Sequence, residues 1–446
     1  MKKFLALIFF ILFAGINIFS QPINLEQART LALASSRSLA KYEMSIRSSV
    51  LDERTQLYSM LPNVSAGYEG SVSYLQNWEF VNPIDTFKSG VSLSIRQVIF
   101  QGGKGLLQKA ISAITTETIR KNALAEYFNV LDSIDNAYYA VLEAAAALEA
   151  EEASLEASSL SYSIAEVRHS TGVINPGDYL KALSDRESRE NSRNQARRNL
   201  ALNMTKFKSL TGISGNVELE KLDFSSYDEV LKYLSAISDD QADALYANFW
   251  KVLESSNPSL ANAALSNLRA QKSYTLTWRD FLPSISAVIL QTGVNFSTAN
   301  GFSITPGQGS VSITGTIPLD VWVLLNKVEK SKIALDSAAY DYISAEINIA
   351  ADLQSALLNT YAQAASVLSS QRSLEYTQRH FEYVMERYRL SLSSVSELSD
   401  ASSLLINSRN SDIKSRYSFL QSLSRLRSMC AMDDEQKLLK ILMGQQ

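Results

Sequence analysis

Two hydrophobic patterns follow one another along the chain, and the first is an alternation with a period of two. In the stretch 63–74, Val64, Ala66 and Tyr68 would face one side of an extended chain, while Asn63 and Ser65 would face the other. Such alternation predicts a β-strand with one apolar face. Polar loops at 76–88 and 297–309, which contain Gly, Asn or Pro, separate the strands of each pair, as a hairpin requires. The predicted strands are 62–75, 90–100, 283–296 and 310–318.

The second pattern is a heptad repeat in very long stretches without proline. Apolar residues recur every seven positions with a second set three residues later, which is typical of a coiled-coil seam. At about 1.5 Å per residue, a helix from 104 to 167 would approach roughly 100 Å. Other helices are predicted at 322–392, 178–211 and 397–430. The seam positions of the first helix are Leu124, Leu131, Tyr138 and Ala145, then Tyr127, Ile134, Val141, Leu148 and Leu155.

The order of these elements occurs twice in the sequence. The segment SSRSLA at 35–40 matches SNPSLA at 256–261, and LPNVSAG at 61–67 matches LPSISAV at 282–288. Internal matches of this kind predict two structural repeats, each built as helix, two strands, long helix, turn and helix. The predicted division is a signal peptide at 1–20, a first repeat at 21–212, a linker at 213–250, a second repeat at 251–430 and a C-terminal tail at 431–446.

The N-terminus and the composition indicate an exported protein. Two lysines, an apolar run over 4–19 and a small residue at Ser20 have the form of a secretory signal peptide. A transmembrane anchor is the alternative, but it needs about 20 apolar residues. The formal net charge is −4, so the chain lacks the excess of positive charge with which a protein would bind nucleic acid. The single cysteine, Cys430, cannot form an internal disulfide.

Beyond residue 21 the sequence contains no run of about 20 apolar residues, so a membrane would be reached through strands. A small soluble sheet with one wet face explains the four strands equally well. Both interpretations stay open on the strands alone.

The search for catalytic or cofactor chemistry leaves no candidate. The GGKG sequence at 102–105 lacks the spacing of a phosphate-binding loop, and no G-x-S-x-G nucleophile motif is present. His169 and His380 have no neighbouring Cys or His to complete a metal site. We therefore expect neither an enzyme nor a cofactor or metal.

A basic stripe lies on the helix predicted at 178–211. Its arginines are spaced by three or four residues and so share one helix face. They are Arg186, Arg189, Arg193 and Arg197. The stripe is either a solvated face or, because it lies close behind a predicted turn, a contact surface for another protein.

A motif at the two predicted helix turns resembles that of the TolC-like outer-membrane efflux proteins. In that family it usually reads R-Y-x-x-G, then D-x-L after five further residues. The first copy, 168–180, has His169 in place of tyrosine, and the second copy, 387–399, has Ser391 for glycine and Glu397 for aspartate. With the duplication and the Leu-Pro strand starts, the resemblance covers nearly the whole mature chain.

The resemblance implies a homotrimer of mainly α fold with membrane β-structure. Each chain would give four strands to one twelve-stranded barrel in the outer membrane, and its long helices would form a coiled-coil tunnel in the periplasm. Gly102, Gly103 and Gly105 would form the hinge between barrel and tunnel. The implied partners are outer-membrane lipid, a periplasmic adaptor protein and an inner-membrane transporter, with no nucleic acid. The basic stripe, Arg186, Arg189, Arg193 and Arg197, would then be a possible contact for the adaptor.

Through the same motif, Asp178, Glu397 and Asp400 correspond to carboxylates that line the family's periplasmic aperture. Ser393 stands where some relatives carry an arginine that closes the gate. Asp178 and Glu397 are equally well explained as helix N-caps or first-turn residues, and both roles are compatible.

Two classes of function follow. The first is a passive exit duct for efflux or type I secretion, coupled to a transporter through an adaptor. The second is an exported coiled-coil structural or adhesin-like envelope protein without transport activity. The matched strand pairs favour the duct, because a bridging coiled coil has no need of them.

Overall fold

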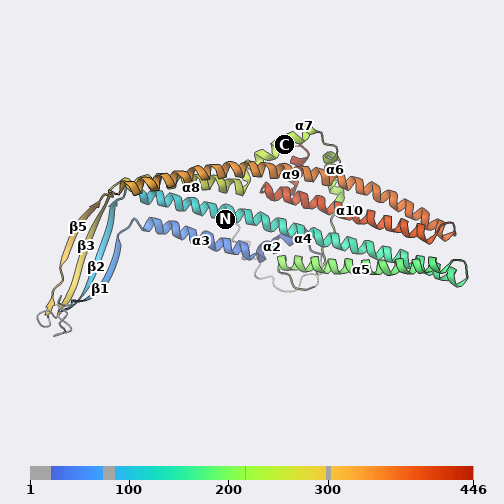
Figure 1. Ribbon diagram of the computed structural model, residues 1–446, viewed down its shortest axis with the longest axis horizontal. Coiled ribbons are helices and arrows are strands. Elements are labelled where there is room, and N and C mark those ends of the chain that lie inside the picture. Colours follow the sequence, from blue (N-terminus) through green and yellow to red (C-terminus); the bar gives the residue numbers. More distant parts are fainter. Residues whose placement is uncertain (1–21, 74–85, 216, 298–302, 445–446) are drawn as a thin grey trace. The chain divides into compact units, whose positions relative to one another are not determined.

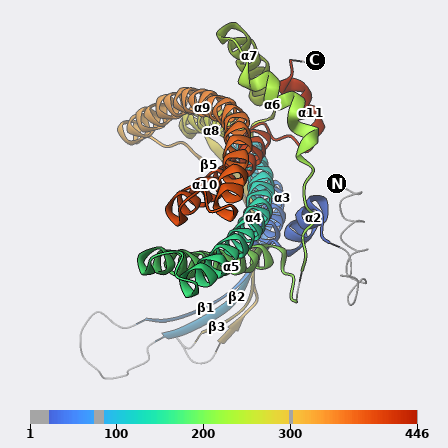
Figure 2. The same ribbon diagram turned by 90° about the vertical axis from the view of Figure 1, so that its right-hand side faces the viewer.

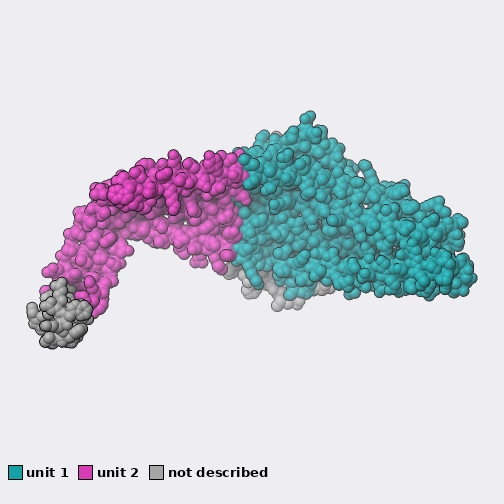
Figure 3. Space-filling model, in the orientation of Figure 1, with its two compact units in different colours: residues 1–40, 123–258, 347–446 teal, residues 41–122, 259–346 magenta. Residues whose placement is uncertain are grey.

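The computed structural model describes residues 22–73, 86–215, 217–297 and 303–444 as two compact units (Figure 3). The predicted signal peptide lies outside these residues. Unit 1 contains residues 1–40, 123–258 and 347–446, and unit 2 contains 41–122 and 259–346. Each unit takes residues from both predicted repeats, because the long helices pass from one unit into the other.

Unit 2 carries an antiparallel sheet whose four longer strands are each connected to one helix (Figure 1). The sheet order is β1-β2-β3, after which β3 pairs with both β5 and the short β4. The strands are β1 (Asn63–Ser73), β2 (Thr86–Phe100), β3 (Ser284–Ser297), β4 (Ser303–Thr305) and β5 (Gly309–Thr316). Two predicted loops are therefore partly wrong: β2 extends back into 76–88, and β4 lies within 297–309, because both segments find backbone partners in the sheet.

The strand register places apolar residues in one continuous row across the sheet. Val64 is opposite Ile95, Ile95 is opposite Ile289, and Ile289 is opposite Val311. In the next row Ser65 and Ser94 share a hydrogen bond of 2.7 Å between their hydroxyl groups. Val64, Ile289 and Val311 are exposed in the single chain, so one face of the sheet is an uncovered apolar surface.

The helices of unit 2 are α3 (Arg37–Tyr58), the first part of α4 (Lys104–Ser170), α8 (Pro258–Trp278) and the first part of α9 (Val321–Arg389). A short 3-10 turn, η2 (Arg279–Phe281), connects α8 to β3. Thr116 on α4 donates a hydrogen bond to the carbonyl of Ser49 on α3. Asn262 on α8 donates to the side chain of Asn122 on α4. The helices α3, α4 and α8 therefore lie side by side in the order of the strands to which they are connected.

The strand-to-helix junction at residues 101–105 depends on two of its three glycines for backbone conformation. Gly102 has φ 61° and Gly103 has φ 78°, both in the left-handed region that favours glycine. A Cβ on Gly102 would also lie 2.6 Å from Cδ1 of Leu282. Gly105 is already in α4, and a Cβ there would lie 2.6 Å from Cε of Met60.

Unit 1 is a bundle of paired helices (Figure 2). The remaining part of α4 pairs with α5 (Pro176–Thr211), and the remaining part of α9 pairs with α10 (Val395–Met429). The other elements of unit 1 are α2 (Leu25–Ser35), η1 (Phe224–Tyr227), α6 (Asp228–Ser235), α7 (Asp239–Ser256) and α11 (Glu435–Leu442). Leu245, Phe249 and Leu253 project from one face of α7 into the main hydrophobic core.

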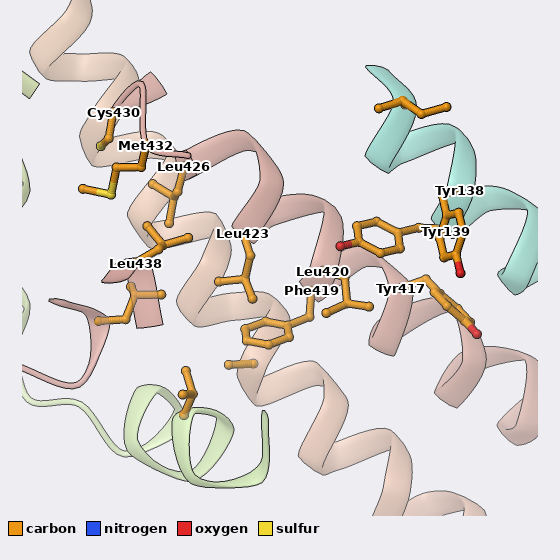
Figure 4. Packing of buried hydrophobic residues seen from close by; sticks show 14 of the residues in the cluster. Tyr138, Tyr139, Tyr417, Phe419, Leu420, Leu423, Leu426, Cys430, Met432 and Leu438 are labelled. Carbon is orange, nitrogen blue, oxygen red and sulfur yellow. The ribbon is translucent and has the colours of Figure 1, made fainter. Parts of the chain in front are cut away.

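The central part of the heptad seam of α4 is buried in unit 1, whereas Tyr127, Ala145, Leu148 and Leu155 are half-buried. Leu131, Ile134, Tyr138 and Val141 are all buried, whereas Leu124, at the start of this part of the helix, is exposed. Residues on a second face of α4 are buried as well, namely Phe128, Tyr139, Leu142 and Ala144. In Figure 4, Tyr138 and Tyr139 lie on α4 close to Tyr417 and Leu420 of α10. The helix is thus covered by more than one partner.

The segment predicted as a C-terminal tail, 431–446, contains the helix α11. Asp434 caps the helix by accepting a hydrogen bond from the backbone N–H of Gln436. Leu438 and Leu442, four residues apart on one face, are fully buried in the core. The helix has only eight residues, so packing rather than length keeps it folded.

A buried carboxylate joins three helices of unit 1. Asp135 on α4 is fully buried and accepts two hydrogen bonds from Arg29 on α2, at 2.7 and 2.9 Å. It accepts two more from α10, one from Arg427 at 2.6 Å and one from Ser424 at 3.0 Å. Arg29 and Arg427 are also buried. Every charge in this group has an opposite charge beside it, which is the condition for burying ions.

Replacing Asp135 by Ala should therefore destabilise unit 1 strongly. Two buried guanidinium groups would lose their carboxylate, and breaking a buried pair costs about 3–5 kcal/mol. The measurement is urea unfolding of the purified protein at one fixed chain concentration. The matched control is Glu149→Ala, whose ion pair with Lys221 is exposed and should contribute about 0–1 kcal/mol. Equal losses in the two variants would contradict this account.

Candidate functional site

The candidate site is the pair of helix turns in unit 1 where α4 passes into α5 and α9 passes into α10. Both turns end the first helix in the same way. Gly172 has φ 74°, and the N–H of Val173 donates to the carbonyl of Arg168 at 2.8 Å. Ser391 has φ 62°, and the N–H of Leu392 donates to the carbonyl of Arg387 at 2.8 Å. Both turns are therefore Schellman caps.

Ser391 takes the left-handed conformation although it is not glycine. A side chain makes this region less favourable, by about 1–2 kcal/mol. The cap hydrogen bonds hold it there nevertheless. The departure from the family motif at this position changes the residue and keeps the geometry of the turn.

The second helix of each hairpin begins with a side-chain cap. In α5 the cap is Asn175, which accepts from the backbone N–H of Asp178 at 2.8 Å. In α10 it is Ser394, which accepts from the N–H of Glu397 at 3.1 Å. Asp178 and Glu397 thus lie in the first turn and are not the N-caps themselves. This is one of the two interpretations given by the sequence, and the position favours negative charge near the helix N-terminus.

Glu397 is held in its ionised form by its own turn. The hydroxyl of Ser393 donates a very short hydrogen bond to the Glu397 carboxylate, and the N–H of Ser394 donates a second. Both hydrogen bonds lower the pKa of this carboxyl group, and the bond from the Ser393 hydroxyl contributes more than the bond from the Ser394 N–H. The Asp178 carboxylate receives a comparable bond from the side-chain amide of Asn175 at 2.9 Å. Asp400, about one turn further along α10, is exposed.

The two turns are joined by contacts that the sequence analysis did not anticipate. Arg168 reaches from the end of α4 to the end of α9, where it donates to the carbonyls of Tyr388 at 2.8 Å and Arg389 at 3.3 Å. Its guanidinium carbon also lies 4.8 Å from the centre of the Tyr388 ring. Lys181 on α5 donates to the hydroxyl of Ser396 on α10 at 2.8 Å. The motif arginine itself could have indicated such a contact. Its partner could not be predicted, because a sequence does not show which backbone carbonyl an arginine reaches.

A small hydrophobic cluster lies beneath these contacts and brings the two hairpins together. It is formed by Ala165, Ala182, Val384, Met385, Tyr388, Val395, Leu398 and Ala401. His169 is stacked on Tyr179 with ring centres 4.8 Å apart, and the hydroxyls of Tyr179 and Tyr162 are 3.1 Å apart. The histidine that replaces tyrosine in the first motif therefore serves as an aromatic packing residue.

The four arginines of the basic stripe have different surroundings. Arg186 pairs with Glu187 and lies over the ring of Tyr162 at 5.2 Å. Arg189 donates to the hydroxyl of Ser403 on α10 at 2.7 Å. Arg193 is half-buried and Arg197 is exposed. The first two arginines thus hold α5 within its own chain, and the accessible part of the stripe is at Arg193 and Arg197.

Neither a metal centre nor a membrane-spanning helix is found where the structure describes the chain. Within residues 22–73, 86–215, 217–297 and 303–444, His, Cys, Asp and Glu nowhere form a group of three that could hold a metal ion. In the same ranges no helix is both long enough and apolar enough to cross a membrane.

Comparison with known proteins identifies the family. The family model described as outer membrane efflux protein matches residues 28–213 and 251–431, which is most of the chain. The chain belongs to the outer membrane efflux protein family. This efflux protein is accordingly a TolC-like outer-membrane protein with a large periplasmic portion, as the sequence predicted.

Individual relatives agree with this assignment. The efflux protein is 23% identical to outer membrane protein TolC of Escherichia coli (strain K12), over 99% of this chain and 89% of the relative. The Campylobacter jejuni CmeC outer membrane channel has a similar fold, with a TM-score of 0.74 at 17% identity over 94% of this chain and 89% of that one. The Neisseria gonorrhoeae MtrE outer membrane channel, solved in an open state, gives a TM-score of 0.72 at 15% identity over 92% and 89%. The predicted fold class is therefore confirmed.

The short bond at Glu397 leads to a pKa prediction. Ser393→Ala removes the hydroxyl that contributes most to the lowered pKa, so the pKa of Glu397 should rise toward the ordinary glutamate value of about 4.3. Carbon-13 NMR of glutamate-labelled protein, titrated from neutral to acidic pH, would follow this carboxyl group. In the wild type its protonation should occur at lower pH than in the variant. Ser170→Ala, a serine of the first turn that bonds only its own helix, is the control and should leave the titration unchanged.

Proposed function

We propose that three copies of this efflux protein assemble into an outer-membrane channel continued by a periplasmic tunnel. The observation that carries the proposal is the sheet of unit 2. Its edge strands, β1 and β5, each have only one strand partner within the described residues, and its apolar face is uncovered. Open strand edges are not tolerated in lipid, so the sheet needs further copies of itself to close.

The proposed assembly acts as a passive exit duct. Four long strands from each of three copies would give a barrel of twelve, and the helices that continue directly from them would enclose the tunnel. The energy for export would come from an inner-membrane transporter, reached through a periplasmic adaptor, in a tripartite efflux pump or a type I secretion system.

Planar-bilayer recording tests the duct directly. Detergent-extracted trimers that lose their SDS resistance on heating should insert and give stepwise conductance in salt solution. A protein that is trimeric but electrically silent would favour the alternative, an envelope protein without transport activity.

The paired turns would form the periplasmic aperture of this duct. Three copies would bring three sets of Asp178, Glu397 and Asp400 together, and a ring of carboxylates attracts cations. The structure of the single chain agrees with such a role for Glu397, whose carboxylate is held ionised by Ser393 and Ser394.

Removing two of these carboxylates should change ion selectivity. We expect Glu397→Ala with Asp400→Ala to lower the preference for cations and to raise the conductance of single channels. Reversal potentials in a salt gradient provide the measurement. Ser394→Ala is the control, because it loses the helix cap, at a cost of about 1 kcal/mol, and keeps both carboxylates. If a folded double variant kept its ion selectivity, Glu397 and Asp400 would not line the aperture.

The accessible arginines of α5 would contact the adaptor. Charge reversal by Arg193→Glu with Arg197→Glu should reduce the yield of adaptor cross-linking in cells several-fold, while trimers still form. The same reversal at Arg186 and Arg189 would disturb contacts within the chain, so these positions are less informative. If the Arg193 and Arg197 variant still cross-linked normally, the stripe would be a solvated face and not a contact for the adaptor.

A further inference from the structure

The sheet of unit 2 has a second face, which is mainly polar, opposite the apolar row. Residues directly opposite one another on neighbouring strands point to the same side of a sheet. One row of this polar face consists of Asn63, Arg96, Val288 and Ser312, taken from β1 to β5. The next row consists of Ser65, Ser94, Leu290 and Ser310. Both rows are polar except for the residue that β3 provides.

Arg96 carries an isolated positive charge on this face. Among the strand residues whose side chains the structure describes, only Arg96 and Glu69 are charged. The Arg96 side chain is exposed and forms no ion pair with any described residue. Its neighbours on the polar face, Asn63 and Ser94, are neutral. The guanidinium group therefore has no counter-charge beside it in the described part of the chain.

Glu69 is too distant to neutralise Arg96. In the pairing of β1 with β2, Asn63 is opposite Arg96, and Glu69 is opposite Gly90. Six residues of strand, at about 3.3 Å per residue, separate the two charges by roughly 20 Å. Exposed charges are largely screened beyond about 8 Å at physiological salt. Arg96 and Glu69 therefore act as separate charges at different heights of the sheet.

The strand-to-helix junction next to Arg96 does not supply a free carboxylate either. Asp280, in the turn before β3, is already paired with Lys104 at 2.8 Å. The residue after Arg96 is fixed by the junction, since the side-chain amide of Gln97 donates to the carbonyl of Met60 at 3.0 Å. Arg96 thus lies on a strand that is held in place close to the helices, and its own side chain stays in solvent.

We propose that Arg96 forms a ring of positive charge on the inner wall of the duct, and that anionic solutes pass this ring preferentially. The inference rests on the proposed trimer, in which the apolar face of the sheet would contact lipid and the polar face would line the lumen. Charged residues destabilise a barrel on its lipid face, whereas lumenal residues determine its selectivity. Three copies would supply three Arg96 side chains at one height, and rings of arginine or lysine select anions in pores.

A barrel of twelve strands is narrow enough for such a ring to act. Barrels of about eight strands are filled by side chains, and those of roughly 16–18 strands leave an aqueous channel. Low-dielectric walls around a cleft also focus the field of the charges that line it. The sign of the ring is opposite to that of the carboxylates proposed for the aperture. The selectivity of the whole channel therefore reports both groups together, and the ring needs a local measurement.

The local measurement is the reactivity of a thiol beside Arg96. Ser94→Cys places the thiol on the same face, two residues away. Channels in planar bilayers at about 0.1 M salt are exposed to a negatively or a positively charged methanethiosulfonate, and steps in conductance give the two rates. The ratio of anionic to cationic rate should be about threefold higher with Arg96 than with Arg96→Gln. Both reagents attack the same thiolate, so the ratio cancels any effect of Arg96 on the thiol itself.

Three controls accompany this measurement. Arg96→Lys keeps the charge and should keep the ratio. At about 1 M salt, where screening acts within about 3 Å, the ratio should fall to that of Arg96→Gln. Ile95→Cys, on the opposite face, should react with neither reagent. The native Cys430 is fully buried and does not contribute.

The possible results separate this inference from the proposed function. Equal ratios with Arg96 and with Arg96→Gln, in channels that conduct normally, would overturn the inference and leave the duct standing. The same holds if Ile95→Cys reacts and Ser94→Cys does not, because the polar face would then not line the lumen. A protein that forms no channel would overturn both.

Reversal potentials provide a second readout that needs no thiol. Arg96→Gln should raise the preference for cations about twofold in the wild type. The factor should be similar in the channel that carries Glu397→Ala and Asp400→Ala, because the two groups of charges act independently. Arg96→Lys should leave the preference unchanged. Absence of a shift in both backgrounds, with normal conductance, would contradict a ring at Arg96.

Discussion

The length of α4 and α9 is the constraint on which the rest of this structure depends. These helices have 67 and 69 residues, or roughly 100 Å each at 1.5 Å per residue. Isolated helices gain little stability in water, so every turn needs a neighbour. No single core is long enough to supply it, and each helix is covered by one set of partners in unit 2 and by another in unit 1. The division into two units cuts through both helices for this reason.

Much of the fold follows from periodicity, because both patterns report which face of an element is buried. The heptad positions Leu131, Ile134 and Tyr138 are buried as a seam should be. The sequence could not reveal that α4 is buried on a second face, because Phe128 and Leu142 lie outside the heptad seam, among polar and small residues. Asp135 was missed for a related reason: its partners, Arg29 and Arg427, are distant in sequence, and nothing local distinguishes a buried carboxylate from a solvated one.

The candidate site shows the same division between local and distant information. The first-turn positions of Asp178 and Glu397 could be predicted, because helix starts have local signals in Asn175, Pro176 and Ser394. The link from Arg168 to the carbonyl of Tyr388 could not, because it joins residues 220 positions apart through a backbone group. No helix was predicted at α11, because its eight residues carry too weak a periodic signal. Its burial comes entirely from tertiary contacts.

The network around Asp135 has a consequence for how this protein is made. Arg427 meets Asp135 across 292 positions, and Arg29 meets the same carboxylate from the other end of the chain. An exported polypeptide emerges from the inner membrane N-terminus first, so the helix bearing Arg29 waits in the periplasm until α10 has also crossed. During that interval the apolar strands have already crossed, while the core of unit 1 is still incomplete. Contacts between such distant residues form slowly and leave hydrophobic surface exposed in the meantime. The chain can therefore complete its native core only after its last segment has been translocated.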